Sequence, residues 1–354
     1  MSSLGVPPPG GRARSNALSG PADPRNPDTQ KIFQLQLANA KPIADSLRSF
    51  LLKVYAKKSL MTDQSIQKWP IGPDGKPVSP QSRDFGDTLS DKLYALYTAE
   101  AKVPSGRTEE DMRKIIQSLQ LLETKYSSAL AGVQSQNYKL DFDGMLKYTG
   151  ADFITVCGDF IFFFPVGGGR AAIRVYANAK YGRITEVIEA LLAWVKANPA
   201  KHGLANFKIA GPAMPKRSDT MVIYCVNTQA ADLISELLLG LPDCFDMAVP
   251  EMTSRKHGTI GISTGAEPNW QATGLGAHMG EQYESNVQLQ ARHGVGGAAY
   301  APQSFGTLRC QAIAAAILNF QMNLDQIRNT FDEFARFVSV AFTGMGLDPS
   351  NPGD

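Results

Sequence analysis

The sequence predicts an α+β protein, with a helical N-terminal region followed by a mixed, largely antiparallel sheet flanked by helices. Two observations support this class. Apolar residues recur at helical spacing through much of residues 30–150. Near Asp152 the period of the apolar residues changes from about 3.6 to about 2, which is typical of strands, and strand and helix patterns then follow one another.

The predicted organisation is a disordered tail over residues 1–29, a mainly helical region over 30–150, an α+β domain over 151–345 and a short tail over 346–354. Residues 1–29 are rich in Pro, Gly, Ser and Arg and contain too little apolar surface to order themselves. Two interpretations of this segment stay open. It is either a flexible tail or an uncleaved export signal of the type III kind.

Apolar spacing predicts helices in the N-terminal half over residues 32–58, 88–101 and 108–131. Thr88 is the expected N-cap of the second helix. The third helix begins after Thr108 with Glu-Glu-Asp, and these acidic residues suit the positive end of a helix dipole.

Period-2 alternation predicts strands over residues 152–165, 170–177, 206–210 and 220–226. The Gly-rich turn Val166-Gly-Gly-Gly169 predicts that the first two strands form a hairpin.

Helices are expected in the C-terminal half over residues 181–198, 228–240, 304–320 and 324–342. The helix over 228–240 is ended by Gly240. Residues 251–303 show no period, so we expect a functional loop or a lid there.

The net charge and the hydropathy argue against two classes of protein, a general nucleic-acid binder and a membrane-spanning protein. A net charge of +2 argues against a general nucleic-acid binder, so a basic site must be local. The longest apolar run, Phe160–Val166, is far shorter than the roughly 20 residues that span a bilayer. The N-terminus has no apolar core typical of a classical signal peptide.

No metal or cofactor is expected from the sequence. The sequence has four cysteines: Cys157, Cys225, Cys244 and Cys310. They lie far apart with no CxxC spacing, which predicts buried free thiols and, weakly, a reducing compartment. The segment Gly274–Gly280 resembles a dinucleotide motif in its glycines, but it lacks the preceding buried strand that such a site needs.

The candidate site is a set of cations at strand starts, on a strand or in a loop, where they can converge on an anion: Arg170, Arg174, Lys208, Lys216 and Arg217. Arg309, in the first turns of the helix over 304–320, joins them as a further candidate. The alternative for each is ordinary surface charge.

Lys208 is the candidate catalytic base. Alternation places Phe207 and Ile209 on one face of their strand and Lys208 on the other. A lysine beside other cations loses its proton more readily, as a general base requires. His257 and His278, in the Gly-rich segment, are the candidate proton donors.

An ordered set of short motifs resembles the HopA-type family of bacterial type III effectors. The motifs extend from residue 180 to residue 352: Lys180-Tyr-Gly182, Lys208-Ile-Ala-Gly-Pro212, Met221-Val-Ile-Tyr224 after Asp219, Thr273-Gly-Leu-Gly276, Ser304 with Gly306 and Arg309, and Gly346–Pro352. Homologues of this domain also act in lanthipeptide maturation beside a kinase-like partner.

More remotely, the segment 170–226 resembles the phosphothreonine lyases, which remove phosphate by β-elimination without metal or cofactor. The resemblance implies that Lys208 is the base and that Arg170 and Arg217 lie near phosphate-binding positions. The sequence departs from that family at Ala172, where the lyases have a histidine that protonates the leaving group.

The resemblance leaves open whether the chain is an enzyme. The leading hypothesis is a phosphate-recognising effector-like protein that eliminates phosphate from phosphothreonine or phosphoserine in a peptide or host protein. One alternative is a peptide-maturation lyase that works with a kinase partner. The other is a non-catalytic adaptor, which binds phosphorylated segments or binds a secretion chaperone. The resemblance also implies a bacterial cytoplasmic protein, or one secreted into a host. The net charge and the hydropathy predict no nucleic-acid or membrane partner.

Overall fold

The computed structural model describes residues 34–63, 89–98, 108–135, 157–158, 160–214, 216–256, 258, 260–266, 305–344 and 347–353. The chain divides into two compact units, residues 1–40 and 41–354. In the first unit, residues 34–38 are helical. Several predictions lie outside the described residues: the tail over 1–29, the Thr88 cap, helix residues 99–101, strand residues 152–156 and segment 267–304.

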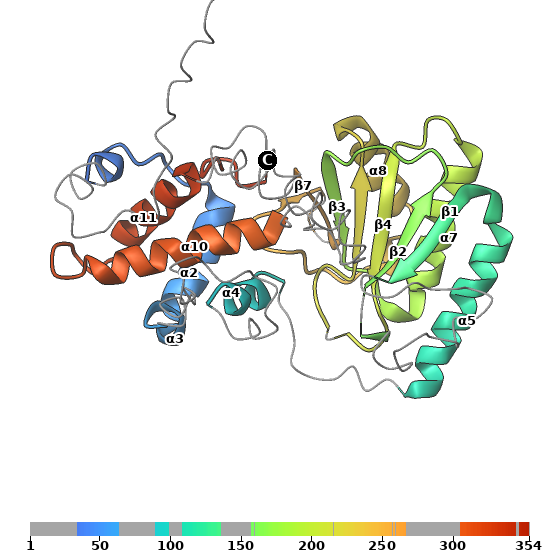
Figure 1. Ribbon diagram of the computed structural model, residues 1–354, viewed down its shortest axis with the longest axis horizontal. Coiled ribbons are helices and arrows are strands. Elements are labelled where there is room, and N and C mark those ends of the chain that lie inside the picture. The colour runs from blue at the N-terminus through green and yellow to red at the C-terminus, as the bar shows by residue number, and fades with distance from the viewer. Residues whose placement is uncertain are drawn as a thin grey trace, which may run out of the picture. The chain divides into compact units, whose positions relative to one another are not determined.

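The second unit contains a seven-stranded sheet in the order β1-β2-β4-β5-β3-β7-β6 (Figure 1). Every neighbouring pair of strands is antiparallel, which confirms the predicted α+β class with a largely antiparallel sheet. The strands are β1 (Leu130–Ser135), β2 (Phe160–Pro165), β3 (Ile173–Ala177), β4 (Leu204–Ala210), β5 (Met221–Cys225), β6 (Ser254–Arg255) and β7 (Ile262–Ala266).

Helices α5 (Glu109–Lys125), α7 (Ile184–Ala197) and α8 (Thr228–Leu239) pack their apolar residues against one face of this sheet. In α7, the residues Ile184, Val187, Ile188 and Leu191 recur at helical spacing and are fully buried. On the sheet side, the stacked rings of Phe163 and Phe207 lie 4.7 Å apart. This face therefore forms the main hydrophobic core.

A second group of helices consists of α2 (Asp45–Ala56), α3 (Lys58–Met61), α4 (Leu89–Tyr97), α10 (Phe305–Met322) and α11 (Phe331–Gly344). In this group α10 contacts both α11 and α4 (Figure 1). Aromatic rings fill the space between the helices. Phe320 meets Phe334 and Phe337 edge to face, with ring centroids 5.6 and 5.5 Å apart. Short 3-10 turns occur at Ser127–Ala129, Tyr181–Arg183 and Pro242–Cys244.

The single helix expected over residues 32–58 is wrong. The chain is extended or irregular from residue 40 to residue 44, and α2 begins only at Asp45. Pro42 explains the break, because a proline inside a helix removes a hydrogen bond and clashes with the preceding turn. A second break at Lys57, whose backbone is extended, separates α2 from α3.

The predicted hairpin between residues 152–165 and 170–177 is also wrong. β2 pairs with β1 and β4, while β3 pairs with β5 and β7. The two strands are therefore separated by β4 and β5, a distance of roughly 14 Å at the usual strand spacing. Residues 166–172 are long enough to cross this distance, and Gly167 gives the turn its left-handed backbone, with φ of 81°.

Three of the strands were not predicted from the sequence: β1, β6 and β7. β1 follows directly after α5 and its 3-10 turn, where the helix had been expected to continue to residue 131. β6 and β7 lie in the segment 251–303, which had been expected to be irregular. They are short and contain Ser, Thr and Gly, so their alternation is weak.

The last helix begins later than expected, at Phe331 rather than near residue 324. Residues 323–326 form turns and residues 327–330 are irregular, and the Thr330 side chain accepts a hydrogen bond from the backbone N–H of Glu333. Thr330 is therefore the N-terminal cap that stops the helix from extending further back.

The C-terminal residues 347–353 are held against the rest of the second unit. The N–H of Ala266 in β7 donates to the Gly353 carbonyl at 2.8 Å, and the N–H of Ala44 donates to the Pro349 carbonyl at 2.9 Å. Arg309 donates from Nε to the Pro352 carbonyl at 2.6 Å. Strand β7, helix α10 and the start of α2 therefore share this segment as a common partner.

The start of α5 offers a test of the local helix signal. Thr108 and Asp111 form a capping box, in which each side chain accepts a hydrogen bond from the other residue's backbone N–H. We expect Thr108→Ala to lower the free energy of unfolding by about 1 kcal/mol, because a helix N–H loses its acceptor. Urea denaturation followed by circular dichroism measures the change.

The matched control is Ser118→Ala in the middle of the same helix. The Ser118 hydroxyl donates only to the Lys114 carbonyl one turn earlier, so alanine there removes no cap. Equal losses of stability in the two variants would show that the capping box contributes nothing.

Candidate functional site

The sheet face opposite α5, α7 and α8 carries two of the predicted cations, Lys208 and Arg174. Lys208 on β4 lies opposite Phe162 on β2 and, on its other side, opposite Val222 on β5. Arg174 on β3 lies opposite Tyr224 on β5. Because side chains alternate along a strand, all five project from the same face.

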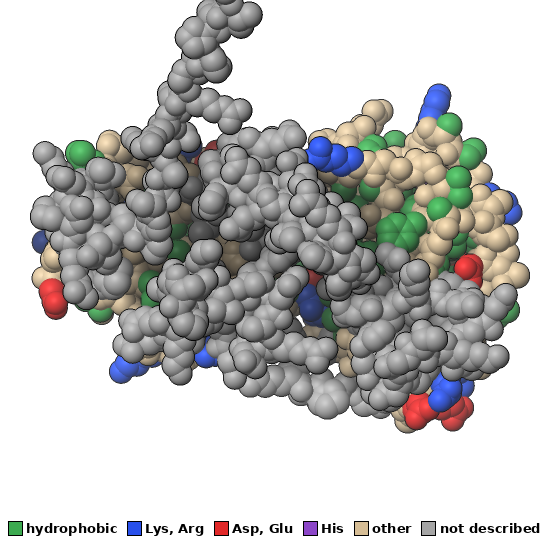
Figure 2. Space-filling view, in the orientation of Figure 1, with side chains coloured by type: hydrophobic (Ala, Val, Ile, Leu, Met, Phe, Trp, Pro, Cys, Tyr) green, Lys and Arg blue, Asp and Glu red, His purple; other side chains and the backbone are tan. Residues whose placement is uncertain are grey.

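We call the surface formed by Phe160, Phe162, Arg174, Lys208 and Tyr224 the cationic face. Apart from Arg174 and Phe160, which are buried, its residues are partly buried. Figure 2 shows hydrophobic side chains at the surface over the region of β2 and β4. The face thus combines apolar rings with positive charges.

Lys208 lies against the aromatic rings of β2. Its Nζ is 3.7 Å from the centroid of the Phe160 ring and 5.4 Å from that of Phe162. A ring face attracts an ammonium group through its quadrupole, and this contact restricts the positions that the long side chain can adopt. The strand anchors the lysine and the rings direct it.

Arg217 approaches the same ring from a different element. It lies in the loop between β4 and β5, and its Cζ is 5.2 Å from the Phe160 centroid. Its Nε and Nη2 donate to the two carboxylate oxygens of Asp219, at 2.6 and 3.0 Å. Both side chains of this ion pair are less than a tenth exposed. The structure thus brings Lys208 and Arg217 together around Phe160.

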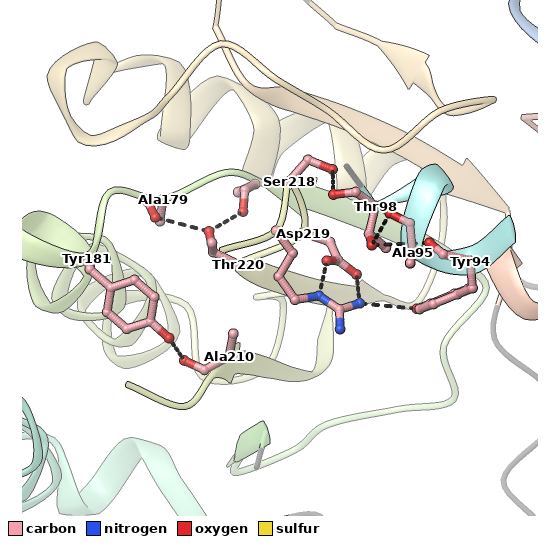
Figure 3. A network of polar contacts seen from close by, with 11 residues as sticks. Tyr94, Ala95, Thr98, Ala179, Tyr181, Ala210, Ser218, Asp219 and Thr220 are labelled. Carbon is pink, nitrogen blue, oxygen red and sulfur yellow. Dashed lines mark hydrogen bonds and ion pairs between the residues drawn. The ribbon is translucent and has the colours of Figure 1, made fainter. Parts of the chain in front are cut away.

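Helix α4 holds the loop between β4 and β5, which carries Arg217 and which we call the basic loop (Figure 3). The Arg217 Nη2 lies 3.4 Å from the hydroxyl of Tyr94, and the Arg217 Cζ is 5.6 Å from the centre of that tyrosine ring. Ser218 donates from its N–H and its hydroxyl to the Thr98 carbonyl, each at 2.8 Å. A helix from the N-terminal half therefore orients a loop of the sheet.

The two ends of the loop are fixed by further hydroxyl groups (Figure 3). The Tyr181 hydroxyl contacts the carbonyls of Ala210 and Gly211, where β4 ends. The Thr220 hydroxyl lies 3.0 Å from the Ala179 carbonyl, just before β5 begins. These contacts fix both ends of the loop that carries Arg217.

Arg174 is, after Lys208, the second cation of the cationic face. It is 6% exposed, and its Cζ is 4.9 Å from the centroid of the Tyr224 ring. Its charge also helps to lower the pKa of Arg309, whose pKa falls to about 10 mainly because the side chain is buried. The two arginines therefore lie close enough to feel each other's charge.

Arg309 itself is directed at backbone carbonyls. It is 1% exposed, and it donates to the carbonyls of Pro352 and Phe305. These bonds join α10 to the C-terminal segment. A phosphate-binding role for Arg309 stays a prediction, and Arg309 is not part of the proposed site.

The remaining predicted residues lie apart from these contacts. Lys216 is exposed and forms an ion pair of 3.5 Å with Asp246. Arg170 is exposed in the link between β2 and β3. His257 and His278 lie outside the described residues.

The sequence did not predict a place in the site for four residues that contact its cations: Phe160, Tyr94, Asp219 and Tyr224. The alternation of Phe160, Phe162 and Phe164 along β2 could have indicated an aromatic face. The pair Arg217-Ser-Asp219 is a local charge signal that could have indicated an ion pair. No sequence signal places Tyr94 beside the loop, because the contact joins residues far apart in the chain.

The arrangement is suited to binding an anion. Lysine and arginine donate charge-assisted hydrogen bonds to phosphate or carboxylate, and the aromatic rings limit the water around them. Among the described residues, no group of three or more His, Cys, Asp and Glu side chains could hold a metal ion. No described helix is long and apolar enough to cross a membrane.

The fold and the face define an α+β protein with a seven-stranded antiparallel sheet and a cationic surface opposite its core. No family model and no curated protein matches the chain. Solved structures that are similar in fold include two effector proteins from Pseudomonas syringae.

The first is the effector protein from Pseudomonas syringae pv. tomato strain DC3000, with a TM-score of 0.54 and 14% sequence identity over 87% of this chain and 95% of that chain. The second is the effector protein from Pseudomonas syringae pv. syringae strain 61, with a TM-score of 0.52, the same identity and the same coverage. At this identity the likeness shows a shared fold.

The ion pair of the basic loop can be tested by removing its acid. Asp219→Ala leaves the Arg217 guanidinium buried without its bidentate partner, so we expect a loss of about 3–5 kcal/mol in the free energy of unfolding. Chemical denaturation of the purified variant measures it. Combining Asp219→Leu with Arg217→Met, which removes both charges, should restore most of the stability.

Glu186→Ala is the matched control, because Glu186 forms an exposed ion pair with Arg183. Solvent screens such a pair, and its loss should change the denaturation midpoint far less. If both single variants lose the same stability, the Arg217–Asp219 pair is no more important than a surface contact.

Proposed function

We propose that this chain is an effector-like protein whose cationic face binds a phosphorylated segment of a peptide or host protein. The observation that carries the proposal is the shared position of Lys208 and Arg217 around Phe160. A phosphorylated threonine or serine carries nearly two negative charges at neutral pH and three acceptor oxygens. Lys208 on a strand and Arg217 in a loop are held there by separate elements, and Arg217 keeps its ion pair with Asp219.

We further propose that the site eliminates the phosphate as a phosphothreonine or phosphoserine lyase, without a cofactor. Lys208 in its neutral form takes the α-proton, and the electrons of that bond form the Cα=Cβ double bond. The Cβ–O bond breaks, and its electrons leave with the phosphate. Arg217 and Arg174 stabilise the charge on the departing group, as cations do where charge develops in a transition state.

The other predicted cations have secondary places in this proposal. Lys216 and Arg170 are exposed and would attract the phosphorylated segment to the face rather than contact the reacting atoms. The phosphorylated segment would come from a host protein if the chain is secreted by a type III system. It would come from a precursor peptide if the chain works in the bacterial cytoplasm beside a kinase-like partner.

One observation favours a non-catalytic alternative. Ala172, at the place where the resembling lyases have their proton-donating histidine, has no proton to give, and its side chain is exposed. The second candidate function is therefore a non-catalytic adaptor, which binds phosphorylated segments or binds a secretion chaperone and leaves the bound molecule unchanged. Nucleic acids and membranes are partners in neither proposal.

Mass spectrometry separates the two functions. We expect the wild-type protein, incubated with phosphothreonine and phosphoserine peptides, to yield a product lighter by one phosphoric acid. Lys208→Arg should keep phosphopeptide binding and lose the elimination, because arginine keeps the charge but stays protonated. Lys208→Ala should lose both.

The control is Lys201→Ala, at an exposed position in the turn before β4, which should leave binding and elimination unchanged. Fluorescence anisotropy with a labelled phosphopeptide measures the binding. If wild-type protein binds the phosphopeptide and never converts it, the adaptor is the correct function. If it does not bind, even in the presence of a kinase partner, both proposals are wrong.

A further inference from the structure

Elimination of phosphate needs an acid as well as a base. The leaving oxygen must receive a proton, because a fully ionised phosphate is a poor leaving group. In this chain the corresponding strand position is Ala172. The donor must therefore come from elsewhere on the cationic face, if the proposed elimination is correct.

We infer that Tyr224 supplies this proton. The inference rests on the proposed function and adds a catalytic residue to it. In the sheet register, Asn206 lies opposite Tyr224 and Lys208 lies opposite Val222, so Lys208 and Tyr224 are diagonal neighbours on one face of adjacent strands. Such neighbours are roughly 7–8 Å apart, within reach of a phenol and a lysine side chain that share one small substrate.

The neighbouring cation suits Tyr224 to this role. Arg174 lies directly opposite it on β3, with the guanidinium carbon 4.9 Å from the centre of the phenol ring. When the phenol gives its proton to the bridging oxygen, a phenolate forms, and a cation at this distance stabilises the new negative charge. Lys208, Tyr224 and Arg174 then form a row across three neighbouring strands.

The other proton-bearing groups of this face fit less well, among the residues that the structure describes. Tyr176 is 3% exposed and its ring packs against Phe305, with centroids 6.0 Å apart. Ser263 is fully buried, and its hydroxyl lies 2.8 Å from that of Thr253. Tyr224 is only partly buried, so a bound phosphopeptide can reach it.

The protons and electrons of the step balance. Lys208 gains the α-proton and becomes an ammonium group, while Tyr224 loses its proton to the bridging oxygen. The products are a dehydrated residue and hydrogen phosphate. Proton transfer through solvent from the Lys208 ammonium to the Tyr224 phenolate then restores the resting state.

The test compares Tyr224→Phe with the wild type on a phosphothreonine peptide. We expect kcat to fall by about 100-fold or more, with KM little changed, because general acid catalysis contributes on that scale.

Tyr55→Phe is the matched control. The Tyr55 hydroxyl bonds to Asn329 in the helical group, so its loss should leave kcat unchanged. Phosphopeptide binding by Tyr224→Phe, measured by anisotropy, shows that the variant is folded.

Two outcomes overturn the inference, and they can be told apart. If the wild type eliminates phosphate and Tyr224→Phe does so at the same rate, Tyr224 is not the acid. In that case the proposed function stands, and His257→Ala and His278→Ala become the variants to examine. If the wild type eliminates nothing, the proposed function and the inference both fall.

Discussion

The burial of one face of the antiparallel sheet is the constraint on which the rest of the structure depends. Helices α5, α7 and α8 cover that face, so every second residue of the central strands must be apolar. The intervening residues are then released from the core and can carry charge. Lys208 stands between the fully buried Phe207 and Ile209 for this reason, and a shift of one residue in β4 would exchange their positions.

The second determinant is the ion pair between Arg217 and Asp219. Burying two charges is costly, and their attraction together with the hydrogen bonds offsets the cost only when the geometry is good. Here the bidentate contact, the Tyr94 hydroxyl and the anchoring of Ser218 by Thr98 supply that geometry. The pair gives a loop residue the fixed orientation that is usual for residues of strands.

Much of the fold could be predicted from the sequence, and the reasons for the failures are physical. Long amphipathic segments such as α7 were located well, because many buried residues repeat at one period. The pairing of β2 was not, since a Gly-rich turn allows a hairpin and a longer crossing equally. The cations were found by their place on strands and loops. The aromatic and acidic residues that orient them, such as Phe160 and Asp219, become visible only when distant segments meet.

The attachment of residues 347–353 has a consequence for synthesis of the protein. The carbonyls of Pro352 and Gly353 accept hydrogen bonds from α10 and β7, although the ribosome adds these two residues only after α10 and β7 have been made. Domains form from the N-terminus during translation, so the central strands and α7 can assemble first. The contacts that fasten α10 and β7 to residues 347–353 must wait until those residues have also been made. A nascent chain therefore passes through a state in which Arg309 is still without its carbonyl partner at Pro352.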